Sequence, residues 1–132
     1  MITLLWRALG EPKAKNTTCA FTDVSKDAYY YDAVLWAVEK GITDGTSATT
    51  FSPDAVCTRA EVVTFMFRTT GFNKVTVQHG FADVAPDAYY ASAVSWASLF
   101  NVTKGTSADA FSPDAVCTRA QAATFLYRYL GK

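Results

Sequence analysis

The stretch FSPDAVCTRA, from Phe51 to Ala60, occurs a second time without change as Phe111 to Ala120. A shorter pair, FTDV at residues 21–24 and FADV at residues 81–84, has the same offset of 60 residues. An ungapped repeat of this kind indicates one supersecondary unit that is copied along the chain. Such a unit buries its apolar surface against its own copies.

A third, partial copy opens the chain. The segment TLLWRALG at residues 3–10 aligns with residues 64–71 and 124–131, which end the two complete copies. The chain is therefore predicted to begin with the last helix of a truncated repeat. The predicted organisation is a terminal helix at 1–10, a linker at 11–20, a repeat at 21–71, a linker at 72–80 and a repeat at 81–131.

Composition narrows the function class. The 132 residues carry 12 basic and 12 acidic side chains, so the formal net charge is zero. That balance excludes the basic footprint of a nucleic-acid-binding domain, and no apolar run is long enough for membrane insertion. Half of the residues are hydrophobic, which predicts a packed core. Arg7 interrupts the short apolar opening, so we expect any secretion signal to lie upstream of this chain.

Each repeat reads as a helix, a long loop and a second helix, which makes the predicted fold all-α. Apolar residues at helical spacing predict the first helix over residues 27–40, and its copy over 87–100. Gly41 and Asn101 follow these helices. Both residue types tolerate the left-handed backbone that commonly ends a helix.

The second helix of each repeat begins with a capping box. In this motif, two residues three positions apart each accept a hydrogen bond from the backbone amide of the other with their side chains. Thr58 and Glu61 form the first predicted box, and Thr118 and Gln121 form the second. These helices are apolar on most of their circumference, so we expect them to be buried among neighbours. Together with the opening helix, they predict a pseudo-threefold helical body.

Arg59 and its copy Arg119 are not explained by helix capping. Each lies in the first turn of a helix, where the macrodipole disfavours a cation. One interpretation is a salt bridge to Asp23, to Asp54 or to their equivalents. The other is an anion site, because helix N-terminal amides and a guanidinium suit a carboxylate or a phosphate. Both interpretations stay open at this point.

Other repeated residues also have two interpretations. Asp23 and Asp83 lie in a short turn before the first helix, where a turn or capping role competes with ligand binding. Trp36 and Trp96 lie in the middle of that helix. Core packing competes there with a role as a platform on which a sugar stacks.

The three cysteines and the single histidine give no catalytic or metal-binding pattern. We expect Cys57 and Cys117 to be free thiols that pack as small apolar groups, with a bridge between them as the alternative. His79 lies in a linker and has no repeated partner. Nucleophile and phosphate-loop motifs are absent from the sequence. We therefore expect neither an enzyme nor a bound cofactor or metal.

The order FxDV, helix, GITDG, FSPD and TRAE resembles the S-layer homology (SLH) domain family over nearly the whole chain. The resemblance implies a module that anchors exported proteins non-covalently to the cell wall at the surface of mostly Gram-positive bacteria. The implied ligand is an anionic secondary cell wall polysaccharide, often with a pyruvate ketal. The implied architecture is a three-pronged spindle of three repeats, with ligand grooves between adjacent repeats.

By motif position, the resemblance implies ligand-binding candidates at Asp23, Gly45 and Arg59 in the first repeat, and at Asp83, Gly105 and Arg119 in the second. Comparison of the two repeats adds Asp44 and Lys104, the charged residues beside the loop glycines. Because an acidic residue in one loop becomes a basic one in the other, the two grooves are expected to differ. The alternative is a structural module without a working groove, in which the incomplete repeat lets copies form a homo-oligomer.

Overall fold

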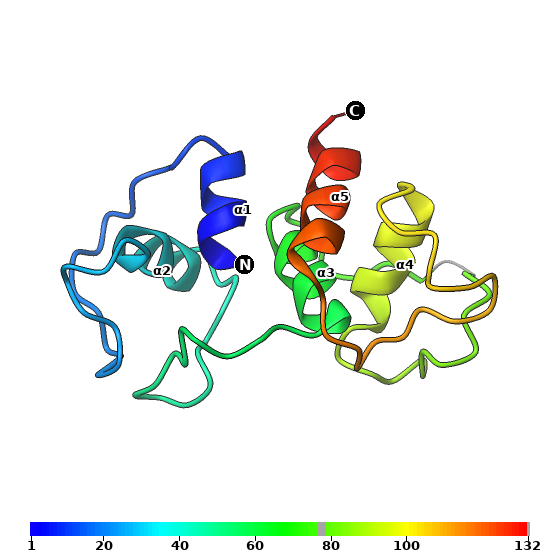
Figure 1. Ribbon diagram of the computed structural model, residues 1–132, viewed down its shortest axis with the longest axis horizontal. Coiled ribbons are helices and arrows are strands. Elements are labelled where there is room, and N and C mark those ends of the chain that lie inside the picture. The colour runs from blue at the N-terminus through cyan, green and yellow to red at the C-terminus, as the bar shows by residue number, and fades with distance from the viewer. Residues whose placement is uncertain (77–78, 132) are drawn as a thin grey trace. The chain divides into compact units, whose positions relative to one another are not determined.

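A computed structural model describes residues 1–76 and 79–131, and this part of the chain contains five α-helices and no β-sheet (Figure 1). The helices are α1 (Ile2–Ala8), α2 (Tyr31–Glu39), α3 (Arg59–Arg68), α4 (Ala91–Leu99) and α5 (Arg119–Leu130). Long loops separate α2 from α3 and α4 from α5. The all-α helix–loop–helix prediction is confirmed for the described residues.

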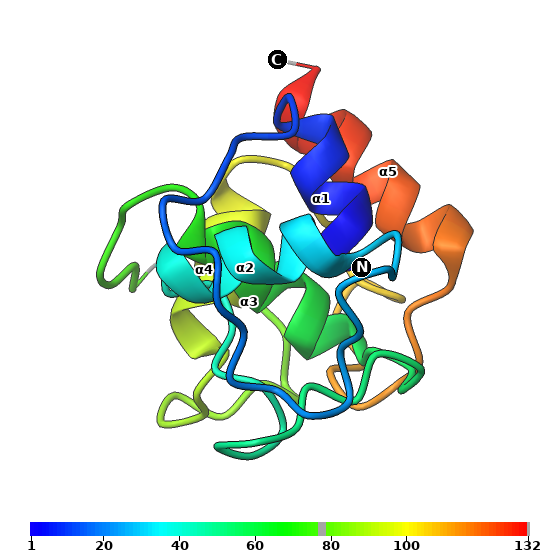
Figure 2. The ribbon, with the colours of Figure 1, turned by 90° about the vertical axis from the view of Figure 1, so that its left-hand side faces the viewer.

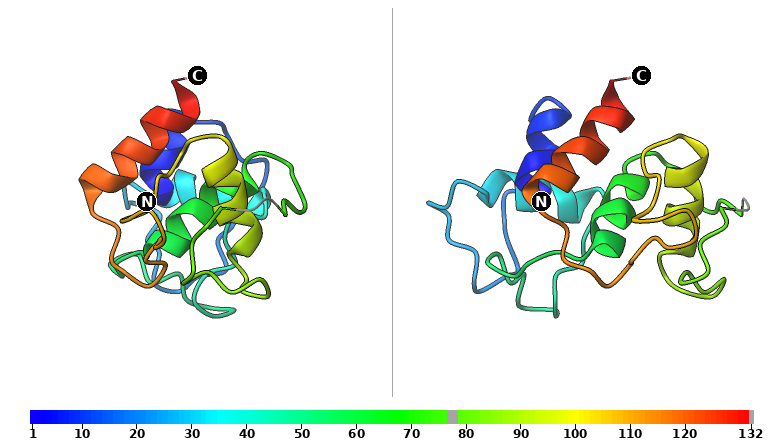
Figure 3. Two further views of the ribbon diagram at one scale, coloured as in Figure 1. Left: turned by 90° about the vertical axis from the view of Figure 1, so that its right-hand side faces the viewer. Right: turned by 45° about the vertical axis from the view of Figure 1, so that its right-hand side comes forward.

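Contacts divide the chain into two compact units, which we call unit 1 (Met1–Ala55) and unit 2 (Val56–Lys132). In unit 1, α1 packs against α2 (Figure 2). In unit 2, α3 packs against α4, and α5 belongs to the same group (Figure 3). In both units, the last helix of one sequence repeat packs on the first helix of the next. The repeat boundaries themselves stay a prediction from the sequence.

The first helix of each repeat starts later than the sequence predicts. In place of a helix at Asp27, the amide of Ala28 donates to the Ser25 carbonyl, and the amide of Tyr31 donates to the Ala28 carbonyl, both at 3.1 Å. These bonds span three residues and form successive turns, so α2 begins only at Tyr31. The second repeat does the same, and α4 begins at Ala91.

The predicted helix ends are confirmed. Gly41 has φ 71°, its amide donates to the Val38 carbonyl at 3.1 Å, and the amide of Ile42 donates to the Ala37 carbonyl at 2.8 Å. This pair of bonds is the Schellman motif, which satisfies the last carbonyls of a helix. Asn101 has φ 59° and ends α4 with the equivalent bonds.

Both predicted capping boxes are also confirmed. The Thr58 hydroxyl accepts from the amide of Glu61 at 3.1 Å, and the Glu61 carboxylate accepts from the amide of Thr58 at 3.0 Å. Thr118 and Gln121 repeat both bonds at the same distances. The Glu-to-Gln difference between the repeats therefore leaves the start of the helix unchanged.

Aromatic and aliphatic side chains fill the core of unit 2. The Trp96 ring lies 6.0 Å from the Phe67 ring and 5.2 Å from the Tyr129 ring, so it contacts α3 and α5 from α4. Other fully buried side chains of unit 2 are Val62, Val63, Met66, Val94, Val102 and Phe111. In unit 1, Phe21, Val24 and Val34 form a buried cluster on which Phe51 packs.

Candidate functional site

The loop before each second helix is held by an aspartate. The Asp83 carboxylate accepts from the amides of Phe111 at 2.9 Å and Ser112 at 2.8 Å. Asp23 accepts the two equivalent amides at the same distances. The structure thus gives both aspartates the turn role. In that role they position the aromatic residue that anchors the loop.

These contacts also set the charge of the two carboxyl groups. The amides of Phe51 and Ser52 lower the pKa of Asp23 below its usual value. At Asp83, desolvation raises the pKa, but the amide bonds and the charge of Arg59 outweigh it and the pKa is lowered. Both aspartates are therefore ionised at neutral pH.

The loop glycines, Gly45 and Gly105, are required by close packing. Gly105 has φ 80°, and a β-carbon there would lie 2.5 Å from both the Phe81 ring and the Ala110 carbonyl. A β-carbon on Gly45 would lie 2.5 Å from the Phe21 ring. No L side chain fits these positions without a shift. Their recurrence in both repeats is thus explained by the fold, whether or not a ligand approaches them.

Arg59 is buried, with only 4% of its surface exposed. Its Nε–H donates to the carbonyl of Phe111 at 2.8 Å. The guanidinium carbon lies 4.8 Å from the centre of the Phe111 ring and 5.2 Å from the centre of the Phe125 ring. This is a cation–π arrangement between two aromatic faces. Burial lowers the pKa of Arg59, while Cys117 and Asp83 act to raise it. A guanidinium nevertheless stays charged in proteins.

The backbone around Arg59 is fastened to the opposite copy of the decapeptide. The amide of Arg59 donates to the Ala115 carbonyl at 2.9 Å, and the amide of Ala60 donates to the Pro113 carbonyl at 3.0 Å. Two amides in the first turn of α3, which have no partner within the helix, therefore donate to the loop before α5. Arg59 belongs to the first sequence repeat, yet its side-chain and backbone partners belong to the second.

Arg119 occupies the same position in the second copy but is exposed. The residues next to it differ in the same way, because Ala60 is buried while Ala120 is exposed. Two arginines with identical local sequence thus have different surroundings. The two side chains are therefore expected to have different roles, Arg59 in a buried setting and Arg119 at the surface.

Beside Arg59 lies a hollow of about 420 Å³ in unit 2. It is lined by two guanidinium groups, three threonines, a glutamine, a glycine and two apolar side chains: Arg59, Arg128, Thr103, Thr106, Thr124, Gln121, Gly105, Ala120 and Phe125. Two cationic side chains among hydroxyl and amide groups provide a site that suits an anionic, hydroxyl-rich ligand. Phe125 adds an apolar ring to the wall.

The accessible cation of this hollow is Arg128, because it is partly exposed whereas Arg59 is almost fully buried. Arg128 Nη1 donates a long hydrogen bond of 3.4 Å to the Val102 carbonyl. From the sequence, we would assign such an arginine to the favourable last turn of a helix and nothing more. A better signal was present, because Gln121, Thr124, Phe125 and Arg128 follow one another at the three- and four-residue spacing of one helix face.

The structure brings Arg59 and Gly105 together and places Asp83 close enough to act on the pKa of Arg59. This grouping crosses the repeat boundary, whereas the candidates taken by motif position stay within one repeat. Asp23 and Gly45 lie in unit 1. Asp44 and Lys104 are both exposed beside their loop glycines, so the predicted difference in loop charge lies at the surface.

Trp36 and Trp96 are buried and do not form a sugar platform. Their exposed fractions are 3% and 2%, so neither ring offers a face to a ligand. The core interpretation is the one the structure supports. A mid-helix position packed against two other helices explains this burial for Trp96.

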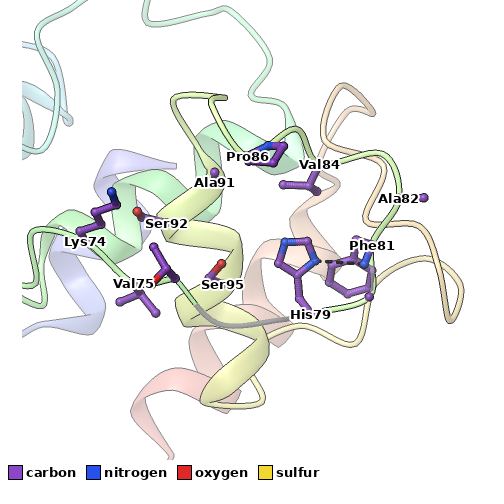
Figure 4. A pocket seen from close by; sticks show the side chains of 12 residues that line it. Lys74, Val75, His79, Phe81, Ala82, Val84, Pro86, Ala91, Ser92 and Ser95 are labelled. Carbon is purple, nitrogen blue, oxygen red and sulfur yellow. Dashed lines mark hydrogen bonds between the residues drawn. The ribbon is translucent and has the colours of Figure 1, made fainter.

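A second hollow, of about 440 Å³, lies beside His79 (Figure 4). The His79 Nδ1 accepts from the amide of Phe81 at 3.0 Å, and the two rings stack with centres 5.2 Å apart. The other lining side chains are mainly small or apolar, and Lys74 is the one cation among them. The hollow beside Arg59 is therefore the better anion site.

Within the described residues, there is no group of three His, Cys, Asp or Glu side chains that could hold a metal ion. Over the same part of the chain, no helix has the length and apolar character needed to cross a membrane.

Comparison with known proteins identifies the repeats. The S-layer homology domain matches residues 20–63 and 80–123, which together make up more than half of the chain. Among similar proteins, a cell surface protein of Thermoanaerobacter kivui is 30% identical over 86% of this chain and 16% of its own length. A surface-layer 125 kDa protein of Lysinibacillus sphaericus is 33% identical over 82% of this chain and 10% of its own length.

An endoglucanase of Bacillus sp. strain KSM-635 is 28% identical over 88% of this chain and 12% of its own length. The chain thus spans at most about a sixth of each of these relatives. A shared segment in proteins with such different names indicates a module that is separate from the rest of each protein. On its two family matches, and on the repeat motifs that its capping boxes and loop aspartates explain, the chain belongs to the S-layer homology domain family.

Proposed function

We propose that this chain is a non-covalent anchoring module that holds a protein at the bacterial cell surface by binding an anionic cell wall polysaccharide. Family membership and the surface proteins among its relatives support the cell-surface location. The polysaccharide is inferred from the hollow beside Arg59. The relatives' other activities belong to those proteins, and this chain is proposed to act as a binding module.

The observation that carries the proposal is the pairing of Arg59 with Arg128 around one hollow. Arg59 supplies a fixed positive charge, because the Phe111 carbonyl and two aromatic rings hold it in place. Arg128 is accessible and can donate to a carboxylate of the ligand. The threonine hydroxyls and Gln121 can then hydrogen-bond sugar hydroxyls. A pyruvate ketal would supply such a carboxylate.

The test is binding of purified, acidic wall polysaccharide to Arg128→Ala, with Arg119→Ala as the matched control on the same helix. A lost charge-assisted hydrogen bond costs about 1.5–3 kcal/mol, so Arg128→Ala should weaken binding by roughly tenfold or more. Arg119→Ala should change it little. Equal losses in both variants, or a loss in Arg119→Ala alone, would contradict the proposed site.

Two further experiments distinguish binding at a charged groove from non-specific binding. Raising the salt concentration should weaken binding to the native chain more than binding to Arg128→Ala, because part of the attraction is electrostatic. Polysaccharide from which the acidic substituents have been removed should bind both proteins about equally. Undiminished binding of that neutral polymer to the native chain would contradict an anion site.

One observation favours a second function, an interaction module in which copies associate. On α5, Ala123 is exposed and Tyr127 is 78% exposed, whereas the equivalent Val63 and Phe67 on α3 are buried. In this second function, the face meets the same face on another copy. Light scattering of the native chain and of Tyr127→Lys decides between the readings. A stable oligomer that is lost in the variant and that ignores the polysaccharide would favour association.

The three-pronged spindle also stays a prediction, in which α1, α3 and α5 are equivalent prongs of one helical body. What supports it is the same pairing of a last helix with a following first helix in both units. Small-angle scattering should then give the radius of one compact particle. An extended particle would contradict the spindle.

A further inference from the structure

Cys57 and Cys117 are 60 residues apart in the sequence, but they face each other in unit 2. Thr58 and Val116 form an antiparallel β-bridge. One residue outward, the amide of Cys117 donates to the Cys57 carbonyl at 2.9 Å. On the other side of this bridge, the amide of Arg59 donates to the Ala115 carbonyl. In an antiparallel pair with this register, Cys57 lies directly opposite Cys117.

This register brings the two side chains close to each other on one face, although a disulfide needs its β-carbons about 3.5–4.5 Å apart. Residues directly opposite in an antiparallel pair have β-carbons about 4.5–5.5 Å apart, and both side chains lie on the same face. Their α-carbons are about 5.5 Å apart in the hydrogen-bonded position. A disulfide spans α-carbons about 4.4–6.8 Å apart, so the α-carbon spacing meets its requirement, and closing the bond needs the two β-carbons to approach by up to about 1 Å.

The two thiols are reduced here and partly exposed, so a small oxidant can reach them. Burial raises the pKa of both thiols, with a smaller rise from Glu61 at Cys57 and from Cys57 at Cys117. For Cys117, the positive charge of Arg59 acts against the rise. Cys117 is therefore the better placed of the two to attack first.

We propose that Cys57 and Cys117 form a redox staple, which a low-molecular-weight disulfide oxidises to an internal disulfide joining the start of α3 to the start of α5. The Cys117 thiolate attacks one sulfur of the small disulfide and releases one small thiolate. The Cys57 thiolate then attacks the Cys117 sulfur and releases the second. The protein loses two electrons, the reagent gains them, and the two protons end on the two small thiols.

The staple would act on the anion hollow without taking part in it. Each cysteine immediately precedes a capping threonine, and Arg59 follows Thr58. Closing the bond fixes the bridge from which the amide of Arg59 donates. The unfolded chain would in turn be constrained by a closed loop of about 60 residues.

The test is to incubate the native chain with oxidised glutathione at mildly alkaline pH and to map the products by mass spectrometry of peptides. The expected product links Cys57 to Cys117 and leaves Cys19 outside the bond. Its thermal unfolding midpoint should rise by roughly 5–10 °C, and dithiothreitol should reverse the rise. Cys57→Ser and Cys117→Ser serve as controls, which should form only glutathione adducts and show no such rise.

Three outcomes would overturn the staple. The first is glutathione adducts on both Cys57 and Cys117 of the native chain without an internal bond. The second is a disulfide that involves Cys19 or a second copy of the chain. The third is a thermal unfolding midpoint that falls when the Cys57–Cys117 bond closes. The last would show that the bond strains the bridge.

Discussion

Arg59 and Arg119 stand at the same position in two identical decapeptides, yet one is 4% exposed and the other lies at the surface. The capping boxes and the aspartate-held loops are the same in both repeats. What differs is the neighbour, because Arg59 lies under the Phe111 loop of the following repeat. Local sequence thus determines how each helix starts, and the adjoining repeat determines what its arginine does.

The largest expected difference between the two positions is in stability. Arg59→Ala removes a charged hydrogen bond, leaves a buried carbonyl unpaired and opens space between two rings, which together cost about 2–4 kcal/mol in free energy of unfolding. Arg119→Ala should cost less than about 0.5 kcal/mol. Urea denaturation of both variants gives the two values. Equal losses would show that the two arginines have the same surroundings.

A second pair of variants tests what the repeats share. Gly45→Ala and Gly105→Ala should each cost roughly 2–3 kcal/mol, because a β-carbon meets an aromatic ring and a carbonyl at a positive φ. Gly41→Ala is the matched control, with positive φ but nothing within 4 Å, and should cost about 1 kcal/mol. Thermal unfolding measures all three. A small effect at one loop glycine alone would mean that the loops differ.

A third variant sharpens the comparison by exchanging one residue between repeats. Gln121 lines the hollow, and its equivalent is Glu61. Gln121→Glu should keep the capping box, since Glu61 already forms one, but it adds a negative charge to the hollow. Binding of acidic polysaccharide should weaken by roughly three- to tenfold, with stability unchanged. Unchanged binding in Gln121→Glu would argue against an anion in this hollow.

The smallest expected effect is on acid stability. The folded-state pKa values of Asp23 and Asp83 are lowered by their amide bonds, so the stability that these carboxylates contribute is present above the unfolded pKa and is lost as pH falls through the folded values. Stability should therefore decline below about pH 4. Asp83→Asn should make that decline shallower. A decline of unchanged steepness in this variant would mean that Asp83 has an unperturbed pKa.

The sequence was sufficient for features that depend on nearby residues. Thr58 with Glu61, and Gly41 after the first helix, each act over a few residues, and the structure has both as predicted. The start of α2 was predicted too early, because successive turns from Ser25 compete with the first helical turn. The burial of Arg59 depends on Phe111 and Phe125, which are more than 50 residues away, and no local pattern contains that contact.

The candidate site shows the same division. Its helix face on α5 was visible in the spacing of Gln121 to Arg128, but a helix face alone does not indicate a hollow. The hollow needs Arg59 from the preceding repeat and Thr103 and Gly105 from the α4–α5 loop. Grouping residues by repeat therefore placed Arg119, instead of Arg59, beside Gly105.

The most direct test of the central claim is an NMR measurement of the arginine side-chain Nε–H groups, with and without an acidic fragment of the wall polysaccharide. The Nε–H of Arg59 should exchange slowly with water, because it donates to the Phe111 carbonyl in a buried position. The Nε–H of Arg119 should exchange quickly. On adding the fragment, the signals of Arg59 and Arg128 should shift while that of Arg119 stays in place. Slow exchange at both Arg59 and Arg119, or a shift at Arg119 alone, would contradict the account.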